Sequence, residues 1–284
     1  MNAAIVGTVL PSLQQLGGMR VHRTLPTRGV AMVGPFIFAD VFGPAPFPSG
    51  PGMGVAPHPH IGISTVTGLF SGAIHHRDGL GTSAMIRPGQ VNLMTAGRGI
   101  THSERPPAAG AGDIPTLWGM QTWLALPDSL EEMAPAFEQQ TSLPVVDANG
   151  ARATVIMGSI WGETAPTTCH APTLHAEIVF SPSGSITIES VATERAVMLV
   201  EGAAELDGTP LQLHALHLLG AGHQPLLGSE KGARLMLLGG EPLYTPRHIW
   251  WNFVHSSPER IREAIVDWQE GRFPPVPGDQ GEQG

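Results

Sequence analysis

The sequence predicts an all-β protein of two lobes with one short helix near its C-terminus. The chain has 284 residues, enough for two domains of ordinary size that each bury a core. Its 36 glycines and 27 prolines exceed the usual share and indicate many turns. Short apolar or alternating runs recur along the chain, and Gly, Pro, Asn or Asp separates most of them. This pattern is typical of strands joined by tight turns.

The predicted strands are spread over the whole chain. Seven runs are the clearest, at residues 30–38, 63–70, 90–94, 117–126, 153–157, 186–189 and 234–238. In the second half, the segment Glu205-Leu-Asp-Gly208 predicts a hairpin turn between alternating apolar positions. We therefore expect each half of the chain to form its own antiparallel β-barrel.

A boundary between the two lobes is expected near residue 140. Residues 127–140 are acidic and contain proline, and the following segment carries Pro144 and the turn-like Asp147-Ala-Asn-Gly150. We therefore predict a first domain over residues 1–140 and a second over residues 141–284, with the terminal helix and tail in the second.

One helix is expected, at residues 257–268. Ser257 can cap its first turn and Pro258 suits that turn. Three apolar side chains would share one face, namely Ile261, Ile265 and Trp268. The tail after Gly271 is polar and rich in proline, and disorder is expected from about Asp279 onward.

Composition and charge exclude several classes of function. The formal charge is −9, and Lys231 is the only lysine, so no basic face is available to neutralise a phosphate backbone. We expect no direct binding of nucleic acid. Cys169 is the only cysteine, which rules out an intrachain disulfide and suits a reducing compartment. No run approaches the length of a membrane span and no signal-peptide pattern is present, so a soluble, cytoplasmic protein is predicted.

Two pairs of side chains predict a metal site. His58-Pro-His60 places two imidazoles two residues apart, and His102-Ser-Glu104 repeats that spacing. Residues i and i+2 of a strand point to the same side, so neighbouring strands would aim three nitrogens and one carboxylate at one point. An isolated His-x-His is usually solvated, and the second pair is what strengthens the metal hypothesis. Such ligands suit one divalent ion, with Fe(II), Mn, Ni, Cu and Zn all acceptable, and leave positions open for water, O₂ or substrate.

Other reactive side chains have simpler explanations. His75 and His76 are adjacent and would face opposite sides of a strand, so one packed and one exposed histidine are expected. The histidines of the second half are scattered and indicate no second metal site. Cys169 has no base marked by the sequence, and we expect it to be a small buried or idle thiol.

Two further motifs have structural explanations. Trp250-Trp251 are expected to anchor the terminal helix to the core rather than to line a ligand pocket. Gly97-Arg98-Gly99 lacks the strand-to-helix context and the lysine of a phosphate loop. A tight turn near the metal is expected there instead.

The chain resembles the pirin family, which belongs to the cupin superfamily. The segments that carry the resemblance are His58-Pro-His60, Met94-Thr-Ala-Gly-Arg-Gly-Ile-Thr-His-Ser-Glu104, Met32-Val-Gly-Pro-Phe-Ile-Phe38, His76-Arg-Asp-Gly-Leu-Gly81, Trp123-Leu-Ala-Leu-Pro127 and Gly240-Glu-Pro-Leu243. The first two together are highly specific, and the resemblance covers nearly the whole chain. It implies two cupin barrels of the jelly-roll type. The first would hold one metal, iron by family preference, through His58, His60, His102 and Glu104, and the second would hold none.

The resemblance also implies a reaction. Some pirins resemble quercetin 2,3-dioxygenases, which open the flavonol ring with O₂ and release carbon monoxide. A dioxygenase acting on quercetin or a related enolisable aromatic is therefore expected, with Glu104 as both ligand and base for the substrate's 3-hydroxyl. Other pirins are regulatory partners of transcription factors or metabolic enzymes, which leaves a non-enzymatic regulatory or redox-sensing protein as the alternative. A pocket that leads to the open metal positions would favour the enzyme.

Four positions differ from the pattern of bacterial pirins. Gly68, Ser71, Gly79 and Leu93 are each smaller than the residue that is usual there. If Gly68 or Leu93 lined the metal barrel, the pocket would be wider and less aromatic than in relatives. A family member that has lost its activity also fits these replacements.

Overall fold

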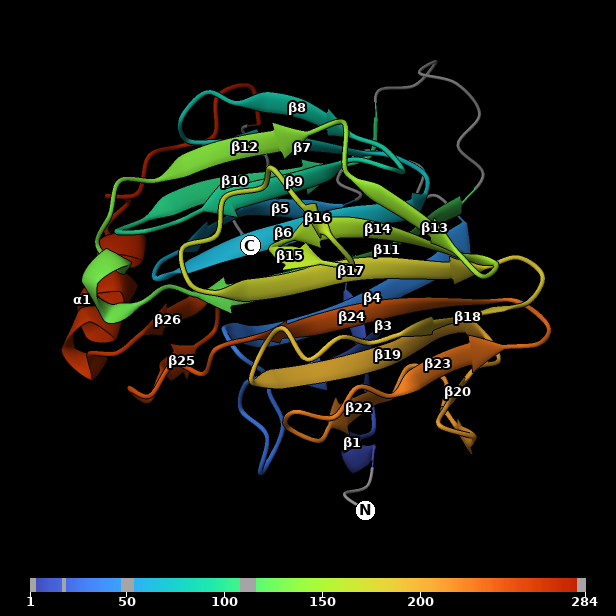
Figure 1. Ribbon diagram of the computed structural model, residues 1–284. Coiled ribbons are helices and arrows are strands. Elements are labelled where there is room, and N and C mark those ends of the chain that lie inside the picture. Colours follow the sequence, from blue (N-terminus) through green and yellow to red (C-terminus); the bar gives the residue numbers. More distant parts are fainter. Residues whose placement is uncertain (1–3, 17–18, 47–53, 108–115, 280–284) are drawn as a thin grey trace. The chain divides into compact units, whose positions relative to one another are not determined.

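The computed structural model describes residues 4–16, 19–46, 54–107 and 116–279. Strands dominate these residues, and α1 (Pro258–Gln269) is the one α-helix among them (Figure 1). The prediction of a mostly β fold with a short C-terminal helix is confirmed. No helix in the described ranges is long and apolar enough to cross a membrane.

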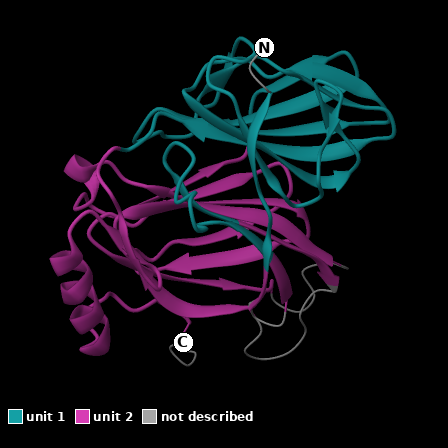
Figure 2. Cartoon of the chain, turned by 90° about the horizontal axis from the view of Figure 1, so that it is seen from below, with its two compact units in different colours: residues 1–12, 22–39, 142–243 teal, residues 13–21, 40–141, 244–284 magenta. Residues whose placement is uncertain are grey.

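One compact unit contains the predicted metal ligands and comprises residues 13–21, 40–141 and 244–284 (Figure 2, magenta). Its seven-stranded sheet has the order β12-β9-β6-β11-β4-β3-β2, and its four-stranded sheet has the order β5-β10-β7-β8. The bounds are β2 (Ser12–Leu16), β3 (Met19–Leu25), β4 (Phe36–Pro46), β5 (Val55–His60), β6 (Ile63–Ser71), β7 (Ile74–Asp78), β8 (Ser83–Ile86), β9 (Val91–Thr95), β10 (Ile100–Arg105), β11 (Thr116–Ala125) and β12 (Ala136–Gln140). A short 3₁₀ helix, η1 (Asp128–Leu130), lies between the last two.

The other unit comprises residues 1–12, 22–39 and 142–243 (Figure 2, teal). It has a seven-stranded sheet in the order β1-β22-β19-β24-β17-β14-β13 and a four-stranded sheet in the order β18-β23-β20-β21. The bounds are β1 (Ile5–Val9), β13 (Val145–Ala148), β14 (Ala151–Met157), β15 (Ser159–Ile160), β16 (Glu163–Thr164), β17 (Thr173–Phe180), β18 (Gly184–Thr187), β19 (Glu194–Gly202), β20 (Glu205–Leu206), β21 (Thr209–Pro210), β22 (Leu216–Leu219), β23 (Leu226–Ser229) and β24 (Ala233–Gly240). Its core is aliphatic, with Ile178, Leu227 and Leu235 fully buried.

Each unit is a pair of open sheets rather than a closed barrel. The hydrogen-bonded order of each sheet has two ends, and the chain passes between the sheets through loops. The expected two lobes of the jelly-roll type are confirmed, each as a pair of sheets without a closed ladder.

The predicted domain boundary stays a prediction. The chain passes between the compact units at Ser142, close to the expected residue 140, but it also passes between them near each end. Residues 22–39 group with the second half, and residues 244–284 group with the first half. The predicted helix therefore belongs to the same compact unit as the predicted ligands.

The turn signals of the sequence coincide with turns of the structure. Asn149 and Gly150 both have positive φ, as do Asp207 and Gly208, which suits the two-residue hairpins between their flanking strands. The run expected at residues 30–38 was wrong in its first part. Gly34 has φ +53° and turns the chain, so the strand begins only at Phe36.

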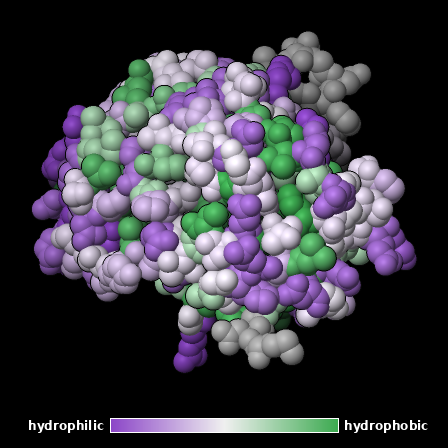
Figure 3. Space-filling model, viewed as in Figure 1, coloured by the Kyte–Doolittle hydropathy of each residue, from purple (hydrophilic) through white to green (hydrophobic). Residues whose placement is uncertain are grey.

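The C-terminal part of the chain forms a hairpin and a capped helix. The hairpin pairs β25 (His248–Trp250) with β26 (Phe253–His255). Ser257 caps α1 by accepting a hydrogen bond from the backbone N–H of Arg260, as predicted. One face of the helix packs on Phe253 and Ile61 through Ile261, Ala264, Ile265 and Trp268. The surface over α1 is mostly hydrophilic in Figure 3, as expected for an amphipathic helix.

Candidate metal centre

The strand β5 carries the first pair of predicted ligands at the edge of its sheet. Proline has no backbone N–H to donate, so Pro57 and Pro59 are tolerated because β5 has a partner on one side only. The alternation of the strand turns His58 and His60 to the same side. Gly62 ends the segment with φ +68°, where a Cβ atom would lie 1.9 Å from the carbonyl oxygen of Val254.

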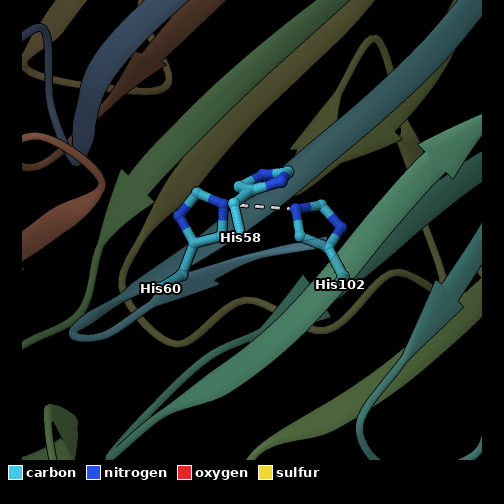
Figure 4. A group of neighbouring side chains, drawn as sticks. All are labelled: His58, His60 and His102. Atoms are coloured by element: carbon cyan, nitrogen blue, oxygen red, sulfur yellow. Dashed lines mark hydrogen bonds between the residues drawn. The ribbon is translucent and has the colours of Figure 1, made fainter. Parts of the chain in front are cut away.

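The strand β10 brings the third histidine to the pair. His102 lies directly opposite His58 in the antiparallel ladder, and Ile100 lies opposite His60. One ring nitrogen from each of the three histidines lies within 4.8 Å of the others, and the rings converge in Figure 4. The Nε2 atoms of His60 and His102 are 3.2 Å apart. The predicted convergence of the three imidazoles is thus present, and these are the only such group among the described residues.

Hydrogen bonds on the outer side of the rings fix which nitrogen faces inward. Nδ1 of His58 lies 2.8 Å from the carbonyl oxygen of Ala56, which can only accept a hydrogen bond. His58 therefore carries its proton on Nδ1 and offers the lone pair of Nε2 to the centre.

A second chain of contacts orients His102. The carboxylate of Asp78 accepts a hydrogen bond from Nε2 of His76 at 3.1 Å, so neutral His76 has its lone pair on Nδ1. That atom lies 3.4 Å from Nδ1 of His102, which therefore donates to it. The Nε2 lone pair of His102 is left to face the centre. Such a carboxylate and imidazole behind a metal-binding histidine is a common way of fixing its tautomer.

Asp78 is itself fixed in its charged form. It is fully buried, and its second oxygen accepts the backbone N–H groups of Leu80 and Thr82. Burial disfavours the carboxylate, but the hydrogen bonds from His76 and Thr82 outweigh it and lower the pKa of Asp78. The ring of His76 also stacks on Phe137.

The three imidazoles are held in the neutral form that binds metals. Burial is the main cause, and repulsion from His58 adds to it, so the pKa values of His60 and His102 lie well below their usual range. Burial also lowers the pKa of His58, although the bond to Ala56 and the charge of Glu104 oppose that fall. The ligands therefore need not lose a proton near neutral pH before a metal binds.

His60 is held from two sides. The ring of Trp123 meets it edge-on, with the centroids 5.1 Å apart. Its Nδ1 atom is buried and makes no well-formed hydrogen bond within the described part of the chain, while the backbone of Asn252 raises the pKa of the ring. Asn252 belongs to the turn of the C-terminal hairpin.

These residues fit a divalent metal ion. Three neutral imidazoles face one point, two of them with their tautomers fixed, and His60 and His102 are each 1% exposed. The Nε2 atoms of His60 and His102 are 3.2 Å apart, close enough for one cation to bind both. The absence of thiolate and the presence of imidazole suit Fe(II), Ni, Cu, Mn or Zn.

Glu104 lies on the same face of β10 as His102 but has other partners in this structure. Nε2 of Gln121 donates to both of its oxygens, at 2.9 and 3.0 Å, and Thr67 donates to one at 3.4 Å. The indole N–H of Trp123 donates to Oε1 of Gln121 at 3.4 Å, which turns the amide nitrogen toward Glu104. Glu104 is outside the group of converging nitrogens, and its place as a fourth ligand stays a prediction.

Glu104 is one of the residues that line a pocket. Its walls are mostly apolar, and Glu104, Gln121, Asp40 and Arg105 are its charged or polar residues. The apolar lining comes from Met19, Val21, Phe42, Val55, Ile74, Pro106 and Leu117. Gly68, Ser71, Gly79 and Leu93 are not among the lining residues, so the expected widening through Gly68 or Leu93 does not apply to this pocket.

The remaining candidates behave largely as expected. His76 is buried and His75 is partly exposed, where it contacts Ser83. Cys169 is exposed, so it is not the small buried residue that was one of its two expected forms. Gly97 and Gly99 have positive φ and make the tight turn before β10.

The two tryptophans are nearly half exposed and are not part of the pocket. Trp251 contacts Trp268 of α1, and Trp250 stacks on Phe253. Both contacts agree with an anchoring role.

Sequence reasoning missed the residues that stand behind the ligands. His76-Arg-Asp78 and Gln121-Thr-Trp123 both have the i, i+2 spacing that identified the ligand pairs. The spacing alone places each pair on one side of a strand. It does not show that β7 and β11 turn that side toward the histidines.

Two jelly-roll units, one with three converging histidines, define a protein of the cupin class. The chain belongs to the pirin family. The family model described as Pirin matches residues 18–124, and the model of the pirin C-terminal cupin domain matches residues 175–274. A pirin-like protein of Caulobacter vibrioides is 40% identical over 278 residues, which cover 95% of this chain and 94% of that protein.

Solved structures with the same fold include two of direct interest. A quercetin 2,3-dioxygenase from Acinetobacter baumannii has a TM-score of 0.91 and 35% identity, covering 98% of this chain and 94% of that one. A bacterial pirin from Escherichia coli, in complex with nickel(II), has a TM-score of 0.64 and 16% identity. The match covers 83% of this chain and 99% of that one. The second comparison shows a shared fold.

Proposed function

We propose that this protein is a metal-dependent dioxygenase that acts on quercetin or a related enolisable aromatic. His58, His60 and His102 hold one divalent ion, Fe(II) in the first instance, and Glu104 completes the site as ligand and base. The observation that carries the proposal is the convergence of the three histidines, close in sequence at His102 to Glu104, which helps to line a mostly apolar pocket. The similarity to the quercetin 2,3-dioxygenase from Acinetobacter baumannii supports it.

The residues of the pocket suit a flat, hydroxylated aromatic substrate. Phe42, Leu117 and Ile74 provide apolar walls, which favour an aromatic ring over a sugar or a charged metabolite. Two of the few polar lining residues, Glu104 and Gln121, are hydrogen-bonded to each other. A substrate oxygen would therefore be directed to these two side chains.

Each residue of the site has a separate task in the proposed reaction. Glu104 accepts the proton of the 3-hydroxyl, which leaves an electron-rich flavonolate. Gln121 holds the carboxylate of Glu104 in place through its amide nitrogen. The apolar walls exclude water from the reactive anion. When bound, the metal supplies Lewis acidity and the means of making O₂ reactive.

The pocket favours the enzyme over the non-enzymatic alternative. A regulatory or redox-sensing protein needs a partner surface but no path from solvent to Glu104. A pocket with mostly apolar walls and a few polar groups is the arrangement expected for a small-molecule site.

Oxygen consumption tests the proposal. Protein loaded separately with Fe(II), Ni(II) or Cu(II) is mixed with quercetin in air, and dissolved O₂ and the flavonol absorbance are recorded. We expect loss of both with at least one metal, together with release of carbon monoxide. Luteolin, which lacks the 3-hydroxyl, should remain unchanged. Unaltered quercetin absorbance with every metal would contradict the proposed substrate.

Glu104→Gln tests the role of the base. The substitution keeps the size of the side chain but removes its ability to take a proton. Turnover should fall on the order of 100-fold, while the three histidines keep most of the metal. Full activity of this variant would refute the role given to Glu104.

A further inference from the structure

The chain beyond α1 runs along the strand that carries two of the predicted ligands. Residues 272–279, here called the C-terminal strap, leave α1 and pass β10 and β7 (Figure 1, red). Phe273 lies against Gly99, where a Cβ atom would be 2.9 Å from the aromatic ring. Pro274 lies against Gly79, where a Cβ atom would be 3.0 Å from it. Gly99 precedes β10 and Gly79 donates a backbone hydrogen bond to it, so the strap touches the beginning of β10.

The end of the strap is attached to the end of the same strand. Arg105, the last residue of β10, donates to Asp279 through Nε at 2.9 Å and through Nη2 at 3.1 Å. The two side chains are only 16% and 8% exposed, so this two-point ion pair is shielded from water and salt. Asp279 was expected to begin a disordered tail, and this pair corrects that expectation. Residues 280–284 lie outside the described residues.

The strap lies on the face of β10 that is turned away from the metal centre. Successive residues of a strand point to opposite faces, so Arg105 is on the same face as Thr101 and Ser103, opposite to His102 and Glu104. Thr101 and Ser103 are 2% and 0% exposed, so this outer face is covered. The strap therefore holds β10 from behind at both ends, with the two predicted ligands between the attachments.

The same segment also reaches the strand of the other two ligands. Phe273 stacks on Phe253 with the ring centroids 5.8 Å apart. Both pack in a cluster with Ile61, the residue that follows His60. A displacement of Phe273 would therefore change the packing next to His60 as well as next to His102.

We infer that the C-terminal strap is a positioning element of the metal centre. It fixes the spacing between His102 and the pair on β5, and the contacts of Arg105, Gly79 and Gly99 are the means by which it acts. The inference rests on the metal-binding part of the proposed function and is independent of the reaction. Loosening the strap is expected to speed the release of metal without unfolding the protein.

Asp279→Asn and Gly79→Ala test the inference from its two ends. The first breaks the ion pair, and the second places a methyl group against Pro274 without touching any charge. Asp147→Asn is the matched control, because it removes the same charge from an exposed ion pair with Arg152 in the other unit. All are made in the full-length chain and loaded with Co(II), whose absorption spectrum reports its coordination.

The readouts are the rate of Co(II) release to a chelator and the midpoint of thermal unfolding of the metal-free protein. Both strap variants should release Co(II) about tenfold faster than wild type and show an altered Co(II) spectrum. The increase in release rate should exceed what any lowering of their unfolding midpoints, relative to Asp147→Asn, accounts for. Wild-type release rates in the strap variants, or faster release only in proportion to a lowered midpoint, would overturn the inference. Failure of wild type to bind Co(II) would instead overturn the metal site itself.

Discussion

At the scale of the residue, the metal centre depends on groups behind the histidines as well as on the histidines. The carbonyl of Ala56 fixes the proton of His58, and the pair of His76 and Asp78 fixes the proton of His102. An imidazole with a fixed tautomer presents its lone pair in one direction. The affinity of the site should therefore respond to residues that never touch the metal.

Asp78→Asn is predicted to weaken metal binding by about 10- to 100-fold. The amide removes the negative charge that holds the proton of His76 on Nε2, and the tautomer of His102 is then no longer fixed. A competition titration with a chromophoric chelator measures the change. His75→Ala is the control, because His75 is on the same strand but contacts Ser83. Equal affinities of Asp78→Asn and wild type would contradict the chain of contacts.

The convergence of the three histidines was predictable from the sequence, and the residues behind them were not. The i, i+2 spacing places His58 and His60 on one side of β5, and the pairing of β5 with β10 brings His102 to them. The contact of His76 with His102 depends on β7 being the neighbour of β10. Strand order is set by how the whole sheet packs, so local spacing carries no information about it.

At the scale of the element, a buried charge network anchors the C-terminal hairpin. Glu131 follows η1 and is 1% exposed, and it accepts a hydrogen bond from the backbone N–H of Ser256 at 2.8 Å. Its carboxylate also lies 3.1 Å from Nε of Arg247, whose side chain is 1% exposed. The network holds the hairpin beside Ile61 and thereby supports the strand of His58 and His60.

Glu131→Ala is predicted to lower the free energy of unfolding by about 1–3 kcal/mol, because it removes the buried acceptor of the Ser256 backbone N–H and the carboxylate beside Nε of Arg247, which keeps its pair with Asp128. Glu132→Ala is the matched control. Its carboxylate is adjacent in sequence but 54% exposed, and its loss should cost less than about 1 kcal/mol. Urea unfolding of both variants measures the difference. Similar losses in the two would show that the Glu131 network does not anchor the hairpin.

Individual strands and turns could be predicted better than which strands lie at the edges of the sheets. The alternation of residues 63–70 and 117–126 and the turns at Asn149 and Asp207 correspond to observed elements. The prediction of a strand over residues 30–38 was wrong in its first part. Gly34 and Pro35 turn the chain there, although the apolar pattern continues through them. The jelly-roll type of both units was expected from the resemblance, but which strands lie at the sheet edges was not, since hydropathy does not specify strand order.

At the scale of the whole molecule, acid should destabilise the folded protein through His175, a histidine of the second half of the chain. Burial lowers the pKa of His175 from 6.5 to about 4, against an opposing hydrogen bond to the carbonyl of Leu237. The unfolded chain therefore binds a proton at this residue below pH 6.5, whereas the folded chain does so only near pH 4. The contribution of His175 to the free energy of unfolding is fully present above pH 6.5. It is lost as the pH falls from 6.5 to about 4.

The predicted loss at His175 is about 3 kcal/mol between pH 6.5 and 4. His175→Asn can keep the donor to Leu237 but does not titrate, so its unfolding free energy should fall less steeply over this range. Denaturant unfolding at several pH values measures the slope for both proteins. Parallel curves would contradict the contribution of His175, whatever the offset between them.

The two-unit organisation was predictable, but the exchange of chain ends was not. Composition and turn signals indicate two lobes and a break near residue 140. That residues 244–284 belong to the unit of the metal ligands follows from contacts such as those of Phe253 with Ile61. Apolar faces in a sequence show that a segment is buried, but they do not show against which half of the chain.

Metal content tests the central claim most directly. Purified wild type and His60→Ala are loaded with the same divalent metal, dialysed together and analysed for bound metal, with circular dichroism to verify that both are folded. We predict one ion per chain in wild type and essentially none in the variant, because His60 is one of the three converging ligands. Equal metal in the two folded proteins would show that the ion is not held by these histidines.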